Sequence, residues 1–280
     1  MTVKRPALRY HGGKWKLAPW IIQHFPEHRV YDEVYGGGAS VLLRKARCYA
    51  EIYNDLDGEI VNVFRVLRDP AQARELQRLI ALTPYARTEF ETSHLVSGDP
   101  IEQARRTIFR SFAGHGSTLT GKYTTGFRVY CGDHRRGATP AGEWKSYANQ
   151  VHVLAERMAG VYIEQRPALD VLAEYDGTKT LHYVDPPYPV GTRGVRHAGK
   201  AYRHEMTDDD HRSLAEVLHS LKGFVILSGY ACDLYDQELF ADWHRVERQT
   251  HADRSLDRTE VLWLNPRAAQ TAQIRMEVAA

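Results

Sequence analysis

Residues 30–43 read Val-Tyr-Asp-Glu-Val-Tyr-Gly-Gly-Gly-Ala-Ser-Val-Leu-Leu, and they decide the fold class. The first five residues favour a β-strand, the three glycines permit a tight turn, and the closing Val-Leu-Leu begins an apolar pattern of helical spacing. The stretch therefore predicts a strand, a glycine turn and a helix. Glycines at this position let a ligand approach the bare backbone beside a helix amino terminus. Nucleotide-like ligands bind to such an arrangement.

A second strand and helix follow directly. Residues 50–53 favour a strand that ends in Asn54-Asp55, and residues 56–67 carry apolar side chains at helical spacing. Asp55 lies 19 positions beyond Gly36, at a strand end where a carboxylate can accept hydrogen bonds from ribose hydroxyls. The alternative is that Asp55 caps the amino terminus of the next helix. The chain therefore begins as a βαβα unit.

The alternation of strands and helices is interrupted in the middle of the chain. Helical patterns at 71–82 and 101–112 are followed by a stretch rich in glycine and threonine at 114–142. Alternation then resumes. We expect strands at 161–164, 180–184, 224–227, 246–250 and 260–264, and helices at 169–175, 208–221 with Thr207 as its cap, and 234–240. This order is typical of the α/β class.

The middle block, residues 69–149, is predicted to be an insertion into a core formed by residues 1–68 and 150–280. Within residues 101–150, eight Lys or Arg stand against three Asp or Glu, with aromatic residues interleaved. This mixture suits nucleic acid, although an ordinary solvated surface has a similar composition. The whole chain gives no such indication, because 37 Lys and Arg against 35 Asp and Glu leave a net charge of +2.

The composition excludes several classes of protein. The chain has 280 residues, 43% of them hydrophobic and 26% charged, which is typical of a folded globular protein. Its three cysteines lack CxxC spacing, and its 14 histidines lack an HExxH frame. This pattern argues against a disulfide framework and against metal catalysis. No apolar run approaches the ~18 residues that a membrane span requires, so we expect a cytoplasmic protein without a metal or a membrane partner.

The segment Tyr10-His11-Gly12-Gly13-Lys14 places an aromatic residue and a lysine on either side of a bare backbone. The frame G-x-x-x-x-G-K-[ST] of a phosphate-binding loop is missing, and Trp15 follows the lysine, so an ATPase is excluded. An amino-terminal turn would explain the glycines alone. A loop that faces a ligand also explains the aromatic residue and the lysine.

The tetrapeptide Asp185-Pro186-Pro187-Tyr188 carries the strongest chemical signal. It directly follows the apolar end of a predicted strand. Prolines have no N–H donor and keep their carbonyls as acceptors, so the Asp185 carboxylate and the Pro186 carbonyl can converge on one amino group. Tyr188 would supply a flat face on which a base could stack. An exocyclic amine of a nucleobase is the expected guest, and an ordinary strand-ending turn is the alternative.

With these motifs the sequence resembles the Dam-like, D12-class N6-adenine DNA methyltransferases, especially their phage and prophage members. The matching segments occur in the family's order: residues 10–14, Tyr35-Gly36-Gly37-Gly38-Ala39-Ser40, Tyr53-Asn54-Asp55 and the tetrapeptide 185–188, followed by Ser228-Gly229-Tyr230 and residues 258–263. Two departures stand out. Tyr35 replaces the usual Phe, and Gln165-Arg166-Pro167 stands where relatives often carry an acidic residue.

The resemblance implies a Rossmann-like S-adenosylmethionine-dependent methyltransferase core with a target-recognition insertion. It implies methyl transfer from S-adenosylmethionine to the N6 of an adenine flipped out of DNA, which leaves S-adenosylhomocysteine. Asp185, Pro186, Pro187 and Tyr188 would then be catalytic. A monomer without a metal is implied, in a bacterial or phage-infected cytoplasm, with a role in protecting DNA from restriction. The implied cofactor-binding residues are Tyr10, Gly12, Gly13, Lys14, Tyr35, Gly36, Gly37, Gly38, Ser40, Asn54 and Asp55.

Two groups of basic residues are predicted to contact DNA phosphates. The first lies in the loop after the tetrapeptide, for which a solvated loop is the alternative: Arg193, Arg196, Lys200 and Arg203. The second lies in the insertion: Arg128, Arg135 and Arg136.

The sequence leaves some alternatives open. The same hydrogen-bond logic serves cytosine N4 or an adenine in RNA, and single strands as well as double strands. A catalytically silent DNA-binding homologue is an alternative of another class. A nicotinamide dehydrogenase is disfavoured, since the third glycine of its fingerprint is missing. Methylation of cytosine C5 is disfavoured, because none of the cysteines lies in a Pro-Cys pair.

Overall fold

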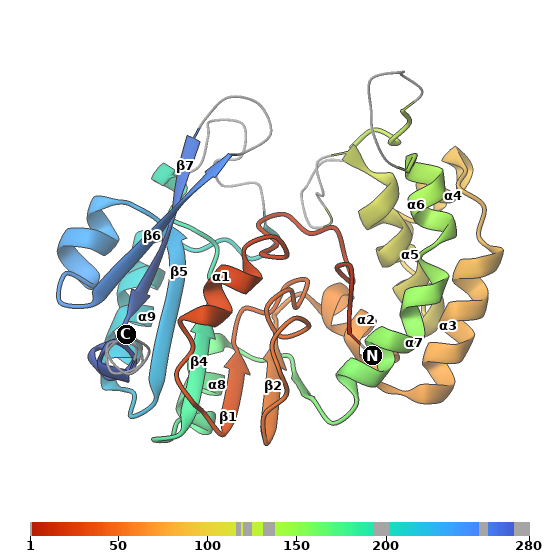
Figure 1. Cartoon of the computed structure of the whole chain (residues 1–280). Coiled ribbons are helices and arrows are strands. Elements are labelled where there is room, and N and C mark those ends of the chain that lie inside the picture. The colour runs from red at the N-terminus through yellow and green to blue at the C-terminus, as the bar shows by residue number, and fades with distance from the viewer. Residues whose placement is uncertain are drawn as a thin grey trace.

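A computed structural model describes residues 2–115, 119, 125–130, 138–192, 202–251 and 257–271. Within these residues, seven strands form one sheet in the order β3-β2-β1-β4-β5-β7-β6 (Figure 1). The first five are parallel, whereas β7 runs antiparallel to both β5 and β6. The bounds are β1 Val30–Glu33, β2 Ala50–Asn54, β3 Tyr162–Glu164, β4 Thr180–Val184, β5 Phe224–Tyr230, β6 His244–His251 and β7 Asp257–Leu264.

The strand order creates a switch point between β1 and β4. From β1 the chain proceeds to β2 and β3 on one side, and β4 and β5 then extend the sheet on the other side. Glu33 at the end of β1 lies opposite Tyr183 of β4, so the two strands end side by side. In open α/β sheets, ligands bind at the carboxyl ends of the strands where the order reverses. This geometry predicts a ligand-binding site at the carboxyl ends of β1 and β4, next to Asp185.

Helices cover both faces of the sheet, as expected for parallel strands buried on both sides. On one face, α8 (Ala168–Tyr175) and α9 (Asp208–Ser220) pack on Val34, Val184 and Val225. On the other face, α1 (Ala18–Gln23) and α2 (Gly58–Arg68) share a hydrophobic cluster with Tyr31 and Tyr183. Thr207 caps α9 in a capping box, which confirms the cap predicted for this helix.

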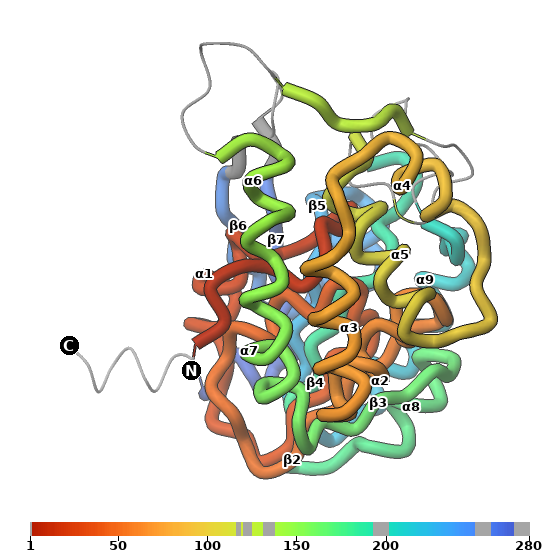
Figure 2. Tube along the Cα trace, turned by 90° about the vertical axis from the view of Figure 1, so that its right-hand side faces the viewer, coloured from red at the N-terminus to blue at the C-terminus, as the bar shows by residue number. Residues whose placement is uncertain are grey.

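The described residues of the middle block are mostly helical and stand beside the sheet (Figures 1 and 2). Asp69, Asp99 and Thr139 cap three of its helices, each of which has Pro at its first position. The boundary expected between residues 149 and 150 falls inside α7, which packs against α2 and α3. The helices of the block are α3 Pro70–Leu82, α4 Arg87–Thr92, α5 Pro100–Ala113, α6 Pro140–Lys145 and α7 Ala148–Met158.

The helix predicted directly after the glycine turn was wrong. Residues 37–45 form successive turns instead, with hydrogen bonds such as Leu43 N to Ala39 O. Ala39 adopts a φ of 52°, outside the helical region, and the Leu42 N–H donates to the Glu33 carboxylate at 2.7 Å. The positive φ of Ala39 therefore departs from the helical conformation, and the strand-end carboxylate satisfies an amide at the start of these turns. Near the carboxyl end, the predicted helical stretch at 234–240 is a π-helix, η4 (Leu234–Leu239).

No helix among the described residues is long and apolar enough to cross a membrane.

Candidate active site

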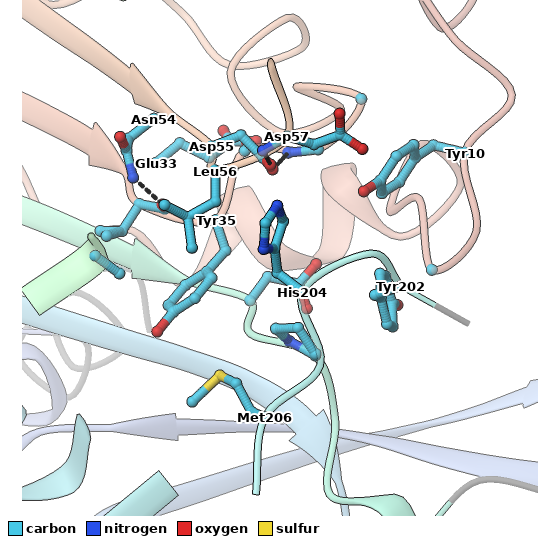
Figure 3. A pocket seen from close by; sticks show the side chains of 18 of the residues that line it. Tyr10, Glu33, Tyr35, Asn54, Asp55, Leu56, Asp57, Tyr202, His204 and Met206 are labelled. Carbon is cyan, nitrogen blue, oxygen red and sulfur yellow. Dashed lines mark hydrogen bonds between the residues drawn. The ribbon is translucent and has the colours of Figure 1, made fainter. Parts of the chain in front are cut away.

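One cavity of about 290 Å³ opens at the carboxyl ends of β1, β2 and β4 (Figure 3). It is lined by the amino-terminal segment at residues 10–14, the glycine turn, the end of β2, the loop before α8 and residues 202–206. All of the residues predicted to bind the cofactor line this cavity, and so do Asp185 and Pro187. The structure thus brings together segments that are far apart in sequence; their binding to a cofactor stays a prediction.

The glycines of the turn are required by two neighbouring tyrosines. A Cβ at Gly36 would lie 2.2 Å from the ring of Tyr53. Gly37 has a φ of +45°, and a Cβ there would lie 2.8 Å from the ring of Tyr10. At Gly38 the nearest atom is the Cβ of Tyr10 at 3.3 Å. Gly36 and Gly37 are therefore fixed by packing and backbone conformation, whereas Gly38 is less constrained.

Asp55 holds the glycine turn rather than capping the helix. Its carboxylate accepts hydrogen bonds from Gly37 N and Asp57 N, each at 2.8 Å. The cap of α2 is Asp57, whose side chain accepts from Glu59 N. Burial raises the pKa of Asp55, although the two backbone donors oppose this shift. The alternative, that Asp55 caps the helix, was therefore wrong, because the cap is Asp57, two residues later.

The side chain of Asn54 is engaged by the backbone of neighbouring segments. It donates to Val34 O at 2.9 Å and Arg166 O at 3.1 Å, and accepts from Arg166 N at 3.0 Å. Asn54 therefore ties the end of β1 to the loop before α8. Its contribution to the cavity is the placement of these two walls.

Lys14, which is buried, and Asp185, which is partly buried, form an ion pair, with Lys14 Nζ 3.0 Å from Asp185 Oδ1. The lysine is 5% exposed and also donates to Gly12 O at 3.0 Å. Burial raises the pKa of Asp185, and Lys14 opposes this shift. Burial lowers the pKa of Lys14, but the carboxylates of Asp185 and Glu260 outweigh it, and its pKa lies above the usual range.

Tyr188 is buried, at 7% exposure, rather than presented as an open platform. The Nζ of Lys14 lies 4.7 Å from its ring centroid, and Tyr230 packs edge-on at 4.7 Å. The hydroxyl contacts Ser228 Oγ at 3.1 Å and donates to Glu260 Oε2 at 3.0 Å. Lys14 therefore lies beside the ring on which a base was predicted to stack.

Sequence reasoning missed Glu33, which lines the cavity at the end of β1. It is 2% exposed and accepts hydrogen bonds from Tyr31 Oη and Leu42 N, both at 2.7 Å. Burial raises the pKa of Glu33 to about 8. Two consecutive acidic residues, Asp32 and Glu33, at the end of a strand expected to be buried were the available signal, since acidic side chains are rarely buried unless they are paired.

Residues 202–206 also line the cavity, and they include Arg203, whose predicted contact with DNA stays a prediction. Arg203 donates to Asp57 Oδ1 and Glu59 Oε1, each at 3.0 Å. Tyr202 packs beside Tyr10, with ring centroids 6.5 Å apart, and the ring of His204 points toward Asp55 in Figure 3. The segment therefore forms a wall of the cavity, anchored on the first turn of α2.

The remaining predicted DNA contacts divide into two groups. Arg128 is 6% exposed and its guanidinium pairs with Glu143, so the structure places it inside the helical block rather than on an open surface. Its burial between α5 and α6 is the physical reason for the difference. The others lie outside the described residues: Arg135, Arg136, Arg193, Arg196 and Lys200.

The strand order, the switch-point cavity and its strand-end carboxylates are those expected of a methyltransferase. Residues 10–252 match the family model described as D12 class N6 adenine-specific DNA methyltransferase. The chain belongs to this family. It is thus an adenine-specific DNA methyltransferase that uses S-adenosylmethionine, which confirms the function and the α/β fold predicted from sequence. The nicotinamide dehydrogenase alternative was wrong.

Two named relatives agree with this assignment. The chain is 24% identical to a DNA adenine methylase of Vibrio cholerae serotype O1 over 233 residues, which cover 78% of this chain and 76% of that protein. It is 23% identical to a DNA adenine methylase of Salmonella typhi over 259 residues, which cover 89% and 87%.

Proposed function

We propose that the chain methylates N6 of adenines in double-stranded DNA, with Asp185-Pro186-Pro187-Tyr188 as its catalytic segment. One observation carries the assignment of the residues. Asp185, paired with Lys14, lies at the end of β4 in the same cavity as the glycine turn and Asp55. An acceptor for the amine and a site for the methyl donor thus meet at the switch point.

Asp185 and the Pro186 carbonyl would accept the two hydrogens of the N6 amine. The lone pair of this amine is delocalised into the adenine ring, which makes it a poor nucleophile. Two acceptors placed at its hydrogens would localise electron density on nitrogen and orient the lone pair for in-line attack on the sulfonium methyl group. This transfer requires no covalent bond between the substrate and the protein. Asp185 would also take up the proton that the methylated amine loses.

Lys14 would keep Asp185 in the ionised form that this role needs. Removal from water favours the neutral acid, and a cation at hydrogen-bond distance favours the carboxylate. The pair is mutual, because Asp185 also helps to hold Lys14 charged. Lys14 is thus assigned to the catalytic centre as well as to the cofactor segment in which the sequence places it.

The residues around the cavity fit S-adenosylmethionine. Bare backbone at the glycine turn, apolar Leu56 and Leu169, and the acidic side chains of Asp55 and Asp185 all line it. Acidic side chains suit a ligand that carries a sulfonium and an ammonium, and Asp55 stands where ribose hydroxyls are bound in such folds. S-adenosylmethionine supplies the activated methyl group when bound.

The partners and location follow from resemblance and from the basic residues of the loop and the insertion. We infer a monomer that acts in the cytoplasm of a bacterium or an infected host and protects DNA from restriction. Arg135, Arg136, Arg193, Arg196 and Lys200 are proposed contacts to phosphates.

The test is the identity of the modified nucleoside. Purified protein is incubated with labelled S-adenosylmethionine and unmethylated duplex DNA, single-stranded DNA or RNA, and each product is digested and separated. N6-methyladenine from duplex DNA is expected. N4-methylcytosine or label in RNA alone would replace the proposed acceptor, and DNA binding without label would indicate a silent homologue.

A further inference from the structure

The carboxyl-terminal strand β7 contributes a buried carboxylate to the catalytic segment. Glu260 is 6% exposed, and its Oε2 accepts the hydrogen bond from Tyr188 Oη at 3.0 Å. The strand that carries Glu260 is paired with β5, where Glu260 lies opposite Tyr230. The mechanism described above assigns no role to this residue.

The Tyr188 hydroxyl contacts side chains of two strands. It donates to Glu260 Oε2 on β7 and lies 3.1 Å from Ser228 Oγ on β5, a contact in which either hydroxyl can donate. Ser228 is 1% exposed. A charge-assisted hydrogen bond out of contact with water is about twice as strong as a neutral one. The hydroxyl is therefore held from β5 and β7 together.

The orientation of the Tyr188 ring matters because the ring contacts Lys14. The two prolines fix the backbone before Tyr188, but they leave its side-chain torsions free. The aromatic face lies 4.7 Å from Lys14 Nζ, and that nitrogen lies 3.0 Å from Asp185. A rotation of the ring would open space beside Lys14 and loosen the pair with Asp185.

We propose that Glu260 is a positioning residue, which acts through the Tyr188 hydroxyl to hold the aromatic wall of the target-base site against Lys14 and Asp185. The inference rests on the proposed function, since it assumes that the base enters beside Asp185. It extends the catalytic centre to a strand that follows the catalytic segment by more than seventy positions.

The test is a double-mutant cycle measured as single-turnover methyl transfer at saturating DNA. Glu260→Gln is expected to lower the rate about 10-fold, while the KM for DNA and the Kd for S-adenosylmethionine stay within about 2-fold. Tyr188→Phe should cause a loss of similar size. In the Tyr188→Phe background, Glu260→Gln should cost less than about 2-fold, because the contact through which it acts is already gone. Glu247→Gln, an exposed carboxylate on the neighbouring strand, is the matched control and should leave the rate unchanged.

Equal losses from Glu260→Gln in both backgrounds, or no loss in the wild-type background, would overturn the proposal. If Glu260→Gln does not fold, Ser228→Ala takes its place, with an expected loss of about 3-fold that also vanishes in the Tyr188→Phe background. The proposed function fails separately, since it requires wild-type protein to form N6-methyladenine at all.

Discussion

The ammonium of Lys14 lies 3.0 Å from the carboxylate of Asp185, although one residue belongs to the amino-terminal segment and the other follows β4. Lys14 is buried and Asp185 is partly buried, and each shifts the pKa of the other. This pair joins the segment proposed to bind the cofactor to the segment proposed to be catalytic. It also makes the charge state of Asp185 depend on a residue outside the tetrapeptide 185–188.

Lys14→Met is expected to shift the pH profile of methyl transfer. Burial already raises the pKa of Asp185, and removal of the cation that opposes this shift raises it further. The acidic limb of the single-turnover rate should therefore move to higher pH, by on the order of one unit. Lys14→Arg keeps a cation beside Asp185, so its acidic limb should stay close to that of wild type. A profile that keeps its acidic limb in Lys14→Met would show that Asp185 does not depend on Lys14.

Gly37→Ala is expected to weaken S-adenosylmethionine binding much more than Gly38→Ala does. At Gly37 the φ of +45° costs an alanine roughly 1–2 kcal/mol, and the new Cβ would meet Tyr10 at 2.8 Å. Calorimetric titration should give a Kd raised at least about 10-fold for Gly37→Ala and within about 3-fold of wild type for Gly38→Ala. Equal effects would mean that the turn is not constrained in the way the structure shows.

Arg203→Gln separates a cavity wall from a DNA contact. Loss of the pairs with Asp57 and Glu59 should loosen residues 202–206, so S-adenosylmethionine should dissociate several-fold faster. DNA affinity and its dependence on salt should not change. A shallower salt dependence, by about one phosphate contact, would instead return Arg203 to the DNA-binding role predicted from sequence.

Glu33→Gln is expected to flatten the pH dependence of stability. Burial raises the pKa of Glu33 to about 8, whereas an unfolded Glu titrates near about 4.3. The folded chain therefore binds the proton more tightly, and this contribution to the unfolding free energy is lost as pH rises through that window, by up to about 1.4 kcal/mol per pH unit. Urea unfolding at several pH values measures the slope. A slope for Glu33→Gln equal to that of wild type would show that Glu33 does not bind this proton. Glu247→Gln serves as the exposed control.

Much of the fold could be predicted because its signals are local. The strand at Thr180–Val184 and the Thr207 cap follow from short patterns of apolar and capping residues. The turns at residues 37–45 could not be predicted, because apolar periodicity records neither the positive φ of Ala39 nor the contact of Glu33 with the Leu42 amide. The local backbone conformation there departs from the helical pattern of the side chains.

The candidate site divides in the same way. The glycines and the strand-end residues Asp55 and Asp185 could be recognised by residue type, and they line one cavity. Arg128 and Arg203 were both expected to face phosphates, yet each pairs with an acidic residue from a distant segment. A basic residue in a loop gives its charge in the sequence, but only the structure gives its partner. The contribution of Glu260 was hidden for the same reason.

Methyl transfer by Asp185→Ala at equal DNA occupancy tests whether Asp185 activates the amine. Wild type, Asp185→Ala and the exposed control Asp242→Ala are compared in single-turnover reactions after their DNA affinities have been measured. Asp185→Ala is expected to bind DNA as wild type does but to form N6-methyladenine about 10²–10³-fold more slowly, a loss typical of a group that stabilises the transition state. Methyl transfer by Asp185→Ala at a rate near that of wild type would show that Asp185 does not activate the amine.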